Sequence, residues 1–377
     1  MAGTIYYIVR YSSMKTSRTN DTLSRVIPGL NYLDQLRLRA AAKGKLFCGP
    51  SSVYIDLTTA CNINCHFCWN HSPLNRKKVF KKDIQLPFDV IKKIVDVSVG
   101  WKVNEILLSG DGEPTLHRHI ARIISYVKDR PLKLFLATNA TFPERLLPSV
   151  GRADHVFIDF SSPDKDHYGS FQSPRNKQLF DRVRGNIARL SCLASRLKKP
   201  RLTVAFIITR LNYPQIPATM ALLGMLKVHD VAFRLVEVTP STRPLALTRE
   251  DKKKLQGIIE KTSRGRFPFL HNLRDVGLGL RDYHKSGFHF SRCFSGWFNL
   301  SVDVNQNVGI CCHNERLRIG SLKTSGLREI WEGRKAAVLR KLCRDSFDLA
   351  RPPFETECEW CHWAGFNRKI ERILARA

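Results

Sequence analysis

Three closely spaced cysteines constrain this chain more than any other feature of its sequence. Cys61, Cys65 and Cys68 are separated by three and then two residues, so one loop can direct all three thiolates at a single inorganic centre. A structural zinc ion needs four ligands, and no fourth cysteine lies nearby. A [4Fe–4S] cluster held by three cysteines keeps one iron open. Because an open iron can bind a substrate or a cofactor, this cysteine loop (residues 61–68) indicates a reactive centre.

Hydropathy and cysteine usage indicate a chain without a membrane span. Of the 377 residues, 43% are hydrophobic, enough for one large domain and a smaller one. No apolar run reaches the roughly eighteen residues that a membrane span needs, and the apolar stretch in residues 1–10 is too short for a signal peptide. Eleven cysteines without an export signal indicate a reducing compartment. We therefore expect a cytoplasmic location.

Basic residues outnumber acidic ones widely. Lys and Arg total 62, Asp and Glu total 33, and the formal net charge is +29. Such a charge attracts polyanions such as nucleic acid or phosphorylated substrates. The basic residues are scattered in short clusters, as also occurs on an ordinary solvated surface. Both interpretations of the charge therefore stay open.

Strand-like and helix-like segments alternate between residues 52 and 240. We expect strands at residues 53–57, 105–109, 133–137, 155–160, 202–209 and 231–238, and helices at 87–99, 118–128, 176–193 and 216–226. This alternation is typical of βαβ units around a mostly parallel sheet. The sequence thus predicts an α/β fold with a partial (β/α)6 TIM-like barrel, in which the cysteine loop follows the first strand.

Polar residues follow successive strands at the end of the barrel where chemistry occurs. The second strand is followed by Gly110, Asp111, Gly112, Glu113 and Pro114, the third by Asn139, the fourth by Ser161 and the fifth by Asn212. We expect the glycines to let the backbone approach a ligand closely. Asp159 and Glu237, at the fourth and sixth strands, are candidate proton acceptors, although the sequence assigns no catalytic base.

The motifs resemble the signature of radical S-adenosylmethionine (radical SAM) enzymes. The three cysteines, with Phe67 before the last one, resemble the family's cluster-binding loop, and residues 110–114 resemble its glycine-rich motif. Thr138-Asn139-Ala140 is similar to a Thr-Asn-Gly that ends the third strand in several branches, with Ala in place of Gly. The resemblance covers about residues 52–240.

The resemblance implies a cofactor and a reaction. The three cysteines would hold a [4Fe–4S] cluster whose open iron binds S-adenosylmethionine, and residues 110–114 and Asn139 would help to bind it. Reductive cleavage would yield a 5′-deoxyadenosyl radical that abstracts hydrogen from an unactivated carbon. By position, Glu113 would bind the methionyl amine, and Ser161 and Asn212 would contact the ribose or the carboxylate. A reducing partner such as flavodoxin or ferredoxin would supply the electron.

Six further cysteines lie in the last third of the sequence. A predicted hairpin, residues 298–310, separates Cys293 from Cys311, and Cys358 and Cys361 form a Cys-x-x-Cys pair. Four such thiolates can hold either zinc or a fully ligated [4Fe–4S] cluster.

This pattern resembles the SPASM/twitch extension of radical SAM enzymes. The resemblance implies one auxiliary [4Fe–4S] cluster with Cys293, Cys311, Cys358 and Cys361 as ligands. Cys312 could replace Cys311, and Cys343, on a helix-like segment, is expected to be a packing residue.

Four regions follow from these patterns. We expect a basic N-terminal extension that packs on the core (1–50), a radical SAM partial barrel (51–245), a connecting segment (246–285) and an auxiliary cluster domain (286–377).

The sequence therefore predicts a radical SAM enzyme whose auxiliary cluster assists oxidation or electron transfer. The first candidate substrate is a small sugar-like or aminocyclitol-like metabolite. A ribosomally made peptide is the second, although residues 1–50 are too few for the recognition domain that peptide maturases usually carry. An RNA base is the third, which the charge of +29 would suit. A non-enzymatic alternative is a basic iron–sulfur scaffold that binds RNA.

Overall fold

The computed structural model describes residues 31–75, 80, 82–174, 176–280, 291–348, 350, 351, 353, 354, 358, 361 and 363–375. Most of the predicted N-terminal extension (1–30) and part of the connecting segment (281–290) lie outside the described residues.

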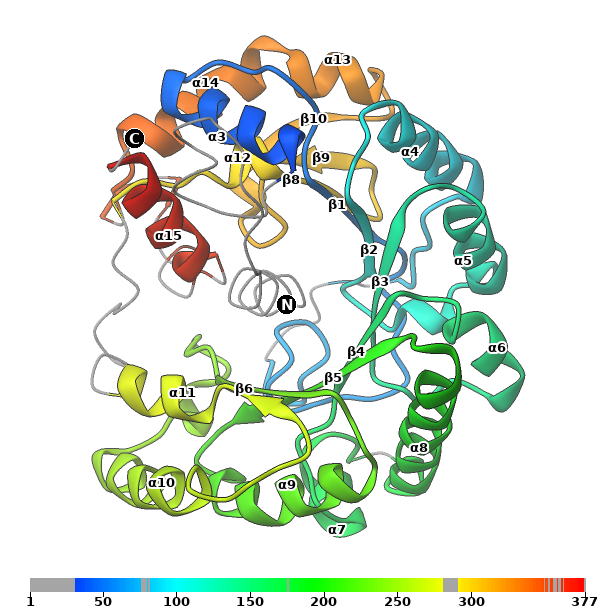
Figure 1. The fold of residues 1–377 in the computed structure, drawn as a ribbon, viewed down its shortest axis with the longest axis vertical. Helices are drawn as coiled ribbons and strands as arrows, with labels where there is room; N and C mark the ends of the chain where they lie inside the picture. Colours follow the sequence, from blue (N-terminus) through cyan, green and yellow to red (C-terminus); the bar gives the residue numbers. More distant parts are fainter. Residues whose placement is uncertain are drawn as a thin grey trace.

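A ten-stranded sheet forms the centre of the described structure, with the strand order β10-β9-β8-β1-β2-β3-β4-β5-β6-β7. The strands are β1 Ser52–Asp56, β2 Glu105–Ser109, β3 Lys133–Thr138, β4 His155–Asp159, β5 Arg201–Ile208, β6 Asp230–Leu235, β7 Leu270–His271, β8 Asn299–Val302, β9 Asn307–Gly309 and β10 Arg318–Ser321. Strands β8 and β1 to β7 pair in parallel, whereas β9 and β10 are antiparallel. The sheet curves into an open barrel (Figure 1), which confirms the predicted α/β fold.

Helices cover the outside of the curved sheet (Figure 1). They are α3 Tyr32–Lys43, α4 Phe88–Gly100, α5 Ile120–Lys128, α6 Leu147–Val150, α7 Lys165–Phe171, α8 Leu179–Leu197, α9 Ile216–Met225, α10 Arg249–Thr262, α11 Leu273–Gly279, α12 Ser295–Phe298, α13 Leu327–Glu332, α14 Arg334–Asp345 and α15 Ala364–Leu374. Of these described helices, none combines the length and the apolar character that crossing a membrane requires.

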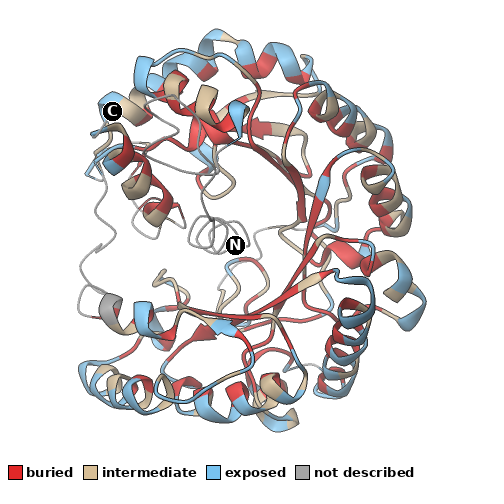
Figure 2. Cartoon of the chain, in the orientation of Figure 1, coloured by how far each residue is buried: buried red, intermediate tan, exposed pale blue. Residues whose placement is uncertain are grey.

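The apolar pattern of the sequence explains this layering. In α5, Ile120, Ile123, Ile124 and Val127 are all buried, and their spacing puts them on one helix face. The sheet itself is buried on both sides, whereas the outer helices expose one face (Figure 2). Strands buried on both faces are typically continuous apolar runs, which is why the sequence located them well.

The inner face of the sheet carries a second, aromatic core. Tyr54, Phe135 and Phe157 from three strands cluster there with Trp363 and with Phe366 of α15. The rings of Tyr54 and Trp363 lie edge to face with 6.0 Å between their centroids. The C-terminal helix therefore fills part of the barrel interior.

The predicted C-terminal hairpin is present as β8 and β9. Its partner was not predicted, because β8 pairs in parallel with β1, from Ser52 opposite Asn299 to Ile55 opposite Val302. The hairpin therefore extends the barrel sheet directly beside the strand that precedes the cysteine loop.

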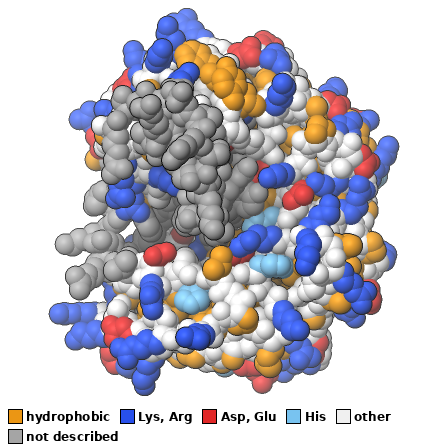
Figure 3. Space-filling view, viewed as in Figure 1, with side chains coloured by type: hydrophobic (Ala, Val, Ile, Leu, Met, Phe, Trp, Pro, Cys, Tyr) orange, Lys and Arg blue, Asp and Glu red, His pale blue; other side chains and the backbone are white. Residues whose placement is uncertain are grey.

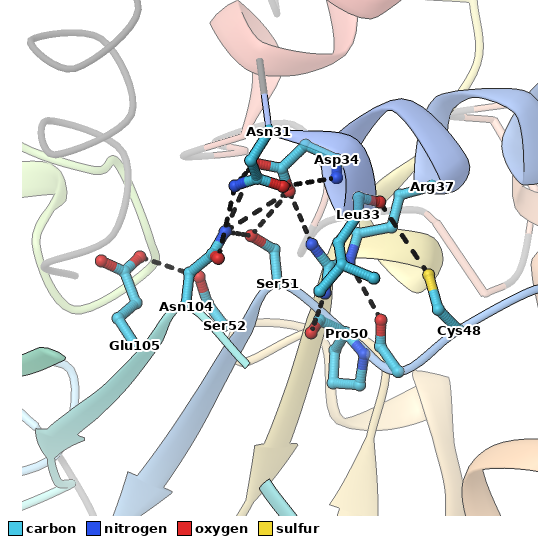
Figure 4. Close-up of polar contacts among 11 residues, drawn as sticks. Asn31, Leu33, Asp34, Arg37, Cys48, Pro50, Ser51, Ser52, Asn104 and Glu105 are labelled. Carbon is cyan, nitrogen blue, oxygen red and sulfur yellow. Dashed lines mark hydrogen bonds and ion pairs between the residues drawn. The ribbon is translucent and has the colours of Figure 1, made fainter. Parts of the chain in front are cut away.

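A buried ion pair fastens α3 to the start of β1 (Figure 4). Arg37 and Asp34 are joined by a 2.6 Å contact, and their side chains are 1% and 7% exposed. Arg37 also donates to the carbonyls of Gly49 (2.9 Å) and Pro50 (2.8 Å). Ser51 donates to Asp34 (3.2 Å). The pair is thus satisfied only in the folded arrangement.

We predict that Asp34→Ala destabilises the protein by about 3–5 kcal/mol, because it leaves the Arg37 guanidinium buried without a counter-charge. Thermal unfolding monitored by circular dichroism measures the effect. Asp89→Ala is the matched control, since Asp89 pairs with Lys92 at the surface and is 80% exposed. Equal unfolding midpoints for the two variants would contradict the prediction.

Candidate functional site

The cysteine loop leaves the sheet at the end of β1, where the sequence predicts it. Cys65 is buried, and Cys61 and Cys68 are half-buried. The Cys68 amide donates to the Cys65 carbonyl (3.0 Å), and the His71 amide donates to the Cys68 sulfur (3.2 Å). The three thiols thus lie on one short hydrogen-bonded loop at the carboxyl end of the sheet.

The environment of these thiols favours their protonated form when nothing is bound. Burial raises the pKa of Cys61 to about 12. Burial also raises the pKa of Cys65 well above its ordinary value, and the charges of Cys68 and Cys61 raise it further. Thiolates here therefore require a bound cation, as in a metal centre whose assembly releases protons.

The arrangement suits a cluster better than a single ion. In the described part of the chain, no three His, Cys, Asp or Glu side chains converge closely enough to hold one metal ion. Each thiolate of a four-iron cluster binds a different iron, so the ligands stand further apart than around zinc. The donor set of three thiols on one loop therefore fits a [4Fe–4S] cluster.

The glycine-rich loop (residues 110–114) presses against the residues that lead into the cysteine loop. Gly112 donates its amide to Thr58 (2.9 Å), and Glu113 donates its amide to Ala60 (2.7 Å). A Cβ on Gly112 would lie 2.1 Å from the Ala60 carbonyl oxygen, so only glycine fits. We expected glycine to permit approach to a ligand; the structure shows that it permits approach to the neighbouring loop.

Glu113 joins the ends of β2 and β3. The residue is 2% exposed, and one carboxylate oxygen accepts from the Thr115 amide (3.0 Å), the Thr115 hydroxyl (2.6 Å) and the Thr138 hydroxyl (2.7 Å). The other oxygen accepts from the Asn139 amide (2.6 Å). A carboxylate accepts about four hydrogen bonds, so this one is saturated by the protein. Its contact with a methionyl amine stays a prediction.

Asn139 connects the end of β3 to the cysteine loop. Its side-chain amide donates to Asn62 (3.0 Å) and lies 4.0 Å from the Cys61 sulfur. The next residue, Ala140, has a φ of 56°, in the left-handed region that favours glycine. The glycine that the family resemblance leads us to expect at this position is thus explained by the backbone, and Ala140 adopts the same conformation at some cost.

Ser161 and Asn212 close the ends of β4 and β5. The Ser161 hydroxyl accepts from the Ile207 amide (2.8 Å). The Asn212 side chain accepts from the Thr209 amide (2.8 Å) and donates to the carbonyls of Ile207 (2.8 Å) and Ser161 (3.3 Å). Both side chains are buried and hold the strand ends together, and their predicted contact with S-adenosylmethionine stays a prediction.

Charged groups line the inner side of the strand ends. Burial raises the pKa of Asp56 to about 6. Burial and then the charge of Asp56 raise the pKa of Asp111 to about 8. At Asp159, burial raises the pKa and the charge of Arg234 lowers it. Asp56 is the member of this group that the sequence did not single out, although its place as the last residue of β1 is the signal that identifies it.

The structure brings the four predicted auxiliary ligands together. Burial raises the pKa of Cys361, and the charges of Cys293, Cys311 and Cys358 raise it further. The Asn314 amide group donates to the Cys358 sulfur (3.4 Å).

The two spare cysteines have different surroundings. Cys312 is influenced by Asp56 and donates or accepts at Trp363, so it faces the inner side of the sheet, away from the set that includes Cys311. Cys343 is buried in α14, and its carbonyl accepts from the Cys293 amide (2.8 Å). Cys343 therefore packs against one member of the auxiliary group.

Two family models match the chain. A model of the Radical SAM superfamily matches residues 55–253, more than half of the chain. A model of an iron-sulfur cluster-binding domain, SPASM, matches residues 293–362.

Curated relatives match parts of the chain. The S-adenosyl-L-methionine-dependent tRNA 4-demethylwyosine synthase of Saccharomyces cerevisiae is 25% identical over 162 residues, which cover 37% of this chain and 20% of that protein. The probable GTP 3′,8-cyclase of Pyrococcus abyssi is 28% identical over 120 residues, which cover 31% of this chain and 37% of that protein. The chain thus matches well under half the length of either relative.

Solved structures share the fold. The crystal structure of Streptococcus suis SuiB bound to S-adenosylmethionine has a TM-score of 0.59 and 14% identity, and the match covers 89% of this chain and 78% of that one. The anSMEcpe structure with bound AdoMet has a TM-score of 0.57 and 17% identity, with 83% and 84% covered. At these identities the likeness concerns the fold.

The raised pKa of Asp111, about 8 against 3.8, predicts a pH-dependent stability. The folded state holds the Asp111 proton more tightly than the unfolded state does, so this contribution is complete below about pH 4 and is lost as the pH rises through 8. Before cluster reconstitution, Asp111→Asn should therefore be more stable than the wild type by about 1–3 kcal/mol at pH 8, and the gap should close toward pH 5. Urea unfolding from pH 5 to 9 measures this, and parallel curves for both proteins would contradict it.

Proposed function

Because the chain belongs to the radical SAM superfamily, we propose that Cys61, Cys65 and Cys68 each bind one iron of its [4Fe–4S] cluster. The chain is an enzyme that uses this cluster and S-adenosylmethionine. The observation that carries the assignment is the convergence of three thiols on one loop at the end of β1, braced by Gly112 and Asn139. When bound, the cluster and S-adenosylmethionine supply a radical that abstracts hydrogen from a carbon atom.

The protein's own residues orient and shield this centre. Phe171, which is buried, contacts Phe67 at 5.4 Å between ring centroids and stacks on His66 at 5.9 Å. The His66 amide also donates to the Phe171 carbonyl (3.0 Å). These contacts hold the loop and exclude water from one side of the thiols, which strengthens electrostatic interactions there.

Cys293, Cys311, Cys358 and Cys361 are the ligands that we assign to an auxiliary [4Fe–4S] cluster. Their mutual influence on one another's ionisation supports this set. The different surroundings of Cys312 argue against it as a replacement ligand. A cluster at this position would accept or relay an electron, with flavodoxin or ferredoxin as the external donor.

A small polar metabolite, sugar-like or aminocyclitol-like, is the substrate that the inner face of the sheet supports best. Asp56, Asp159 and Arg234 present carboxyl and guanidinium groups there, which suit hydroxyl or amino groups. Peptide substrates receive support only from a shared fold, since SuiB bound to its precursor peptide SuiA is 13% identical to this chain.

An RNA substrate is the second candidate, favoured by the net charge of +29 and by the relatives named as tRNA 4-demethylwyosine synthases. Lys and Arg side chains are spread over the visible face of the molecule rather than gathered in one stripe (Figure 3). This spread provides general attraction to a polyanion and makes RNA the weaker of the two candidates.

We predict that Cys65→Ala lowers the iron content from about eight to about four per chain after anaerobic reconstitution, because one of two four-iron clusters is lost. The same variant should form no 5′-deoxyadenosine with dithionite and S-adenosylmethionine. Iron analysis and chromatography of the products measure both effects.

Two matched variants sharpen this test. Cys192→Ala, which removes an exposed thiol, should change neither quantity. The double variant Cys358→Ala, Cys361→Ala should also lose about four iron but keep cleavage of S-adenosylmethionine. No 5′-deoxyadenosine from the wild type would contradict the proposed reaction.

If RNA is the substrate, affinity for mixed tRNA should fall by about 10³-fold or more between 50 and 200 mM salt, since bound phosphates release counter-ions. Fluorescence anisotropy of labelled tRNA measures the affinity. The absence of binding at 50 mM salt would remove the RNA candidate.

A further inference from the structure

Tyr168 is a fully buried tyrosine whose hydroxyl has no hydrogen-bond partner among the described residues. The residue is 0% exposed, and its hydroxyl oxygen is shielded from solvent. It lies in α7, where the Tyr168 amide donates to the Asp164 carbonyl (3.0 Å) and its carbonyl accepts from Gln172 (2.9 Å) and Ser173 (2.8 Å). The backbone therefore holds the side chain in one position.

The ring of Tyr168 packs in an aromatic environment that would also accept phenylalanine. Its centroid lies 6.0 Å from that of Phe160 and 5.9 Å from that of Phe180. A buried hydroxyl without a partner costs about 1–3 kcal/mol. A tyrosine at this position therefore indicates that the hydroxyl finds an acceptor in the assembled protein.

Three groups around the hydroxyl could accept its proton. Burial raises the pKa of Tyr168, and the charges of Cys65, then Cys61, then Glu113 raise it further. The Glu113 carboxylate already accepts four hydrogen bonds from Thr115, Thr138 and Asn139. The remaining acceptors are the two sulfurs, which accept weakly as thiols and strongly as metal-bound thiolates.

We propose that the Tyr168 hydroxyl donates a hydrogen bond to the Cys65 thiolate of the assembled cluster and thereby raises the reduction potential of that cluster. Cys65 is the better acceptor because it is the buried member of the pair and the first of the charges that act on Tyr168. A hydrogen bond to a ligand sulfur stabilises the reduced cluster, which carries one more negative charge. Tyr168 is thus a positioning residue that sets how readily an electron enters the centre, and this role rests on the ligand assignment proposed above.

The test compares midpoint potentials of the holoenzyme by redox titration monitored by electron paramagnetic resonance. Tyr168→Phe should shift the potential of the cluster on the cysteine loop to a more negative value. Replacement of Tyr168 by 3-fluorotyrosine, a stronger donor of nearly the same shape, should shift it to a more positive value. Tyr126→Phe is the control, since the Tyr126 hydroxyl donates to the exposed Asp96 carboxylate (2.9 Å), and its potential should equal that of the wild type.

A second readout is the exchangeable proton coupled to the reduced cluster, observed by electron–nuclear double resonance in H₂O and D₂O. This coupling should disappear in Tyr168→Phe and persist in Tyr126→Phe. Unchanged potentials in both Tyr168 replacements, or a coupling that survives in Tyr168→Phe, would overturn the inference. If Tyr168→Phe does not load iron, the 3-fluorotyrosine protein decides by the sign of its shift. Failure of the wild type to bind iron at the cysteine loop would instead overturn the ligand assignment itself.

Discussion

The contact between the cysteine loop and the glycine-rich loop is the constraint on which the rest of the site depends. Gly112 packs so close to the Ala60 carbonyl that a single added carbon would lie 2.1 Å from its oxygen. Two amide hydrogen bonds, from Gly112 and Glu113, join the same segments. Because β1 and β2 are adjacent parallel strands, the loops that follow them are forced together, and the position of the three thiols follows from the register of the sheet.

Glu113 extends this bracing to the third strand. A saturated, buried carboxylate is costly unless every lone pair has a donor, and here the donors come from Thr115 in its own loop and from Thr138 and Asn139 at the end of β3. Asn139 then returns to the cysteine loop through Asn62. Three strand ends are therefore tied into one unit. A polar residue that looks like a ligand contact in the sequence serves, in the protein itself, to hold the ligand-bearing loop.

Local pattern was enough to predict most of the barrel, because a strand such as β1 is an unbroken apolar run and a helix such as α5 has one apolar face. The pairing of β8 with β1 was out of reach, since it joins residues some 250 positions apart in sequence and no local signal specifies a long-range partner. The same limit applies to Cys311 and Cys312. Adjacent residues can face opposite sides of a sheet edge, and only the fold decides which thiol joins the auxiliary group.

The two sides of the barrel interior differ in the hydrogen bonds that they can offer. Near β1 and β2, Asp111 retains its proton at neutral pH, because its pKa is about 8, and a protonated carboxyl can donate as well as accept. Near β4 and β6, Arg234 supplies a fixed donor beside Asp159. A substrate between them would meet a neutral carboxyl on one side and a cation–carboxyl pair on the other. This asymmetry suits a molecule with several hydroxyl or amino groups, which can both donate and accept, better than an apolar one, since a polar group buried without a partner is costly.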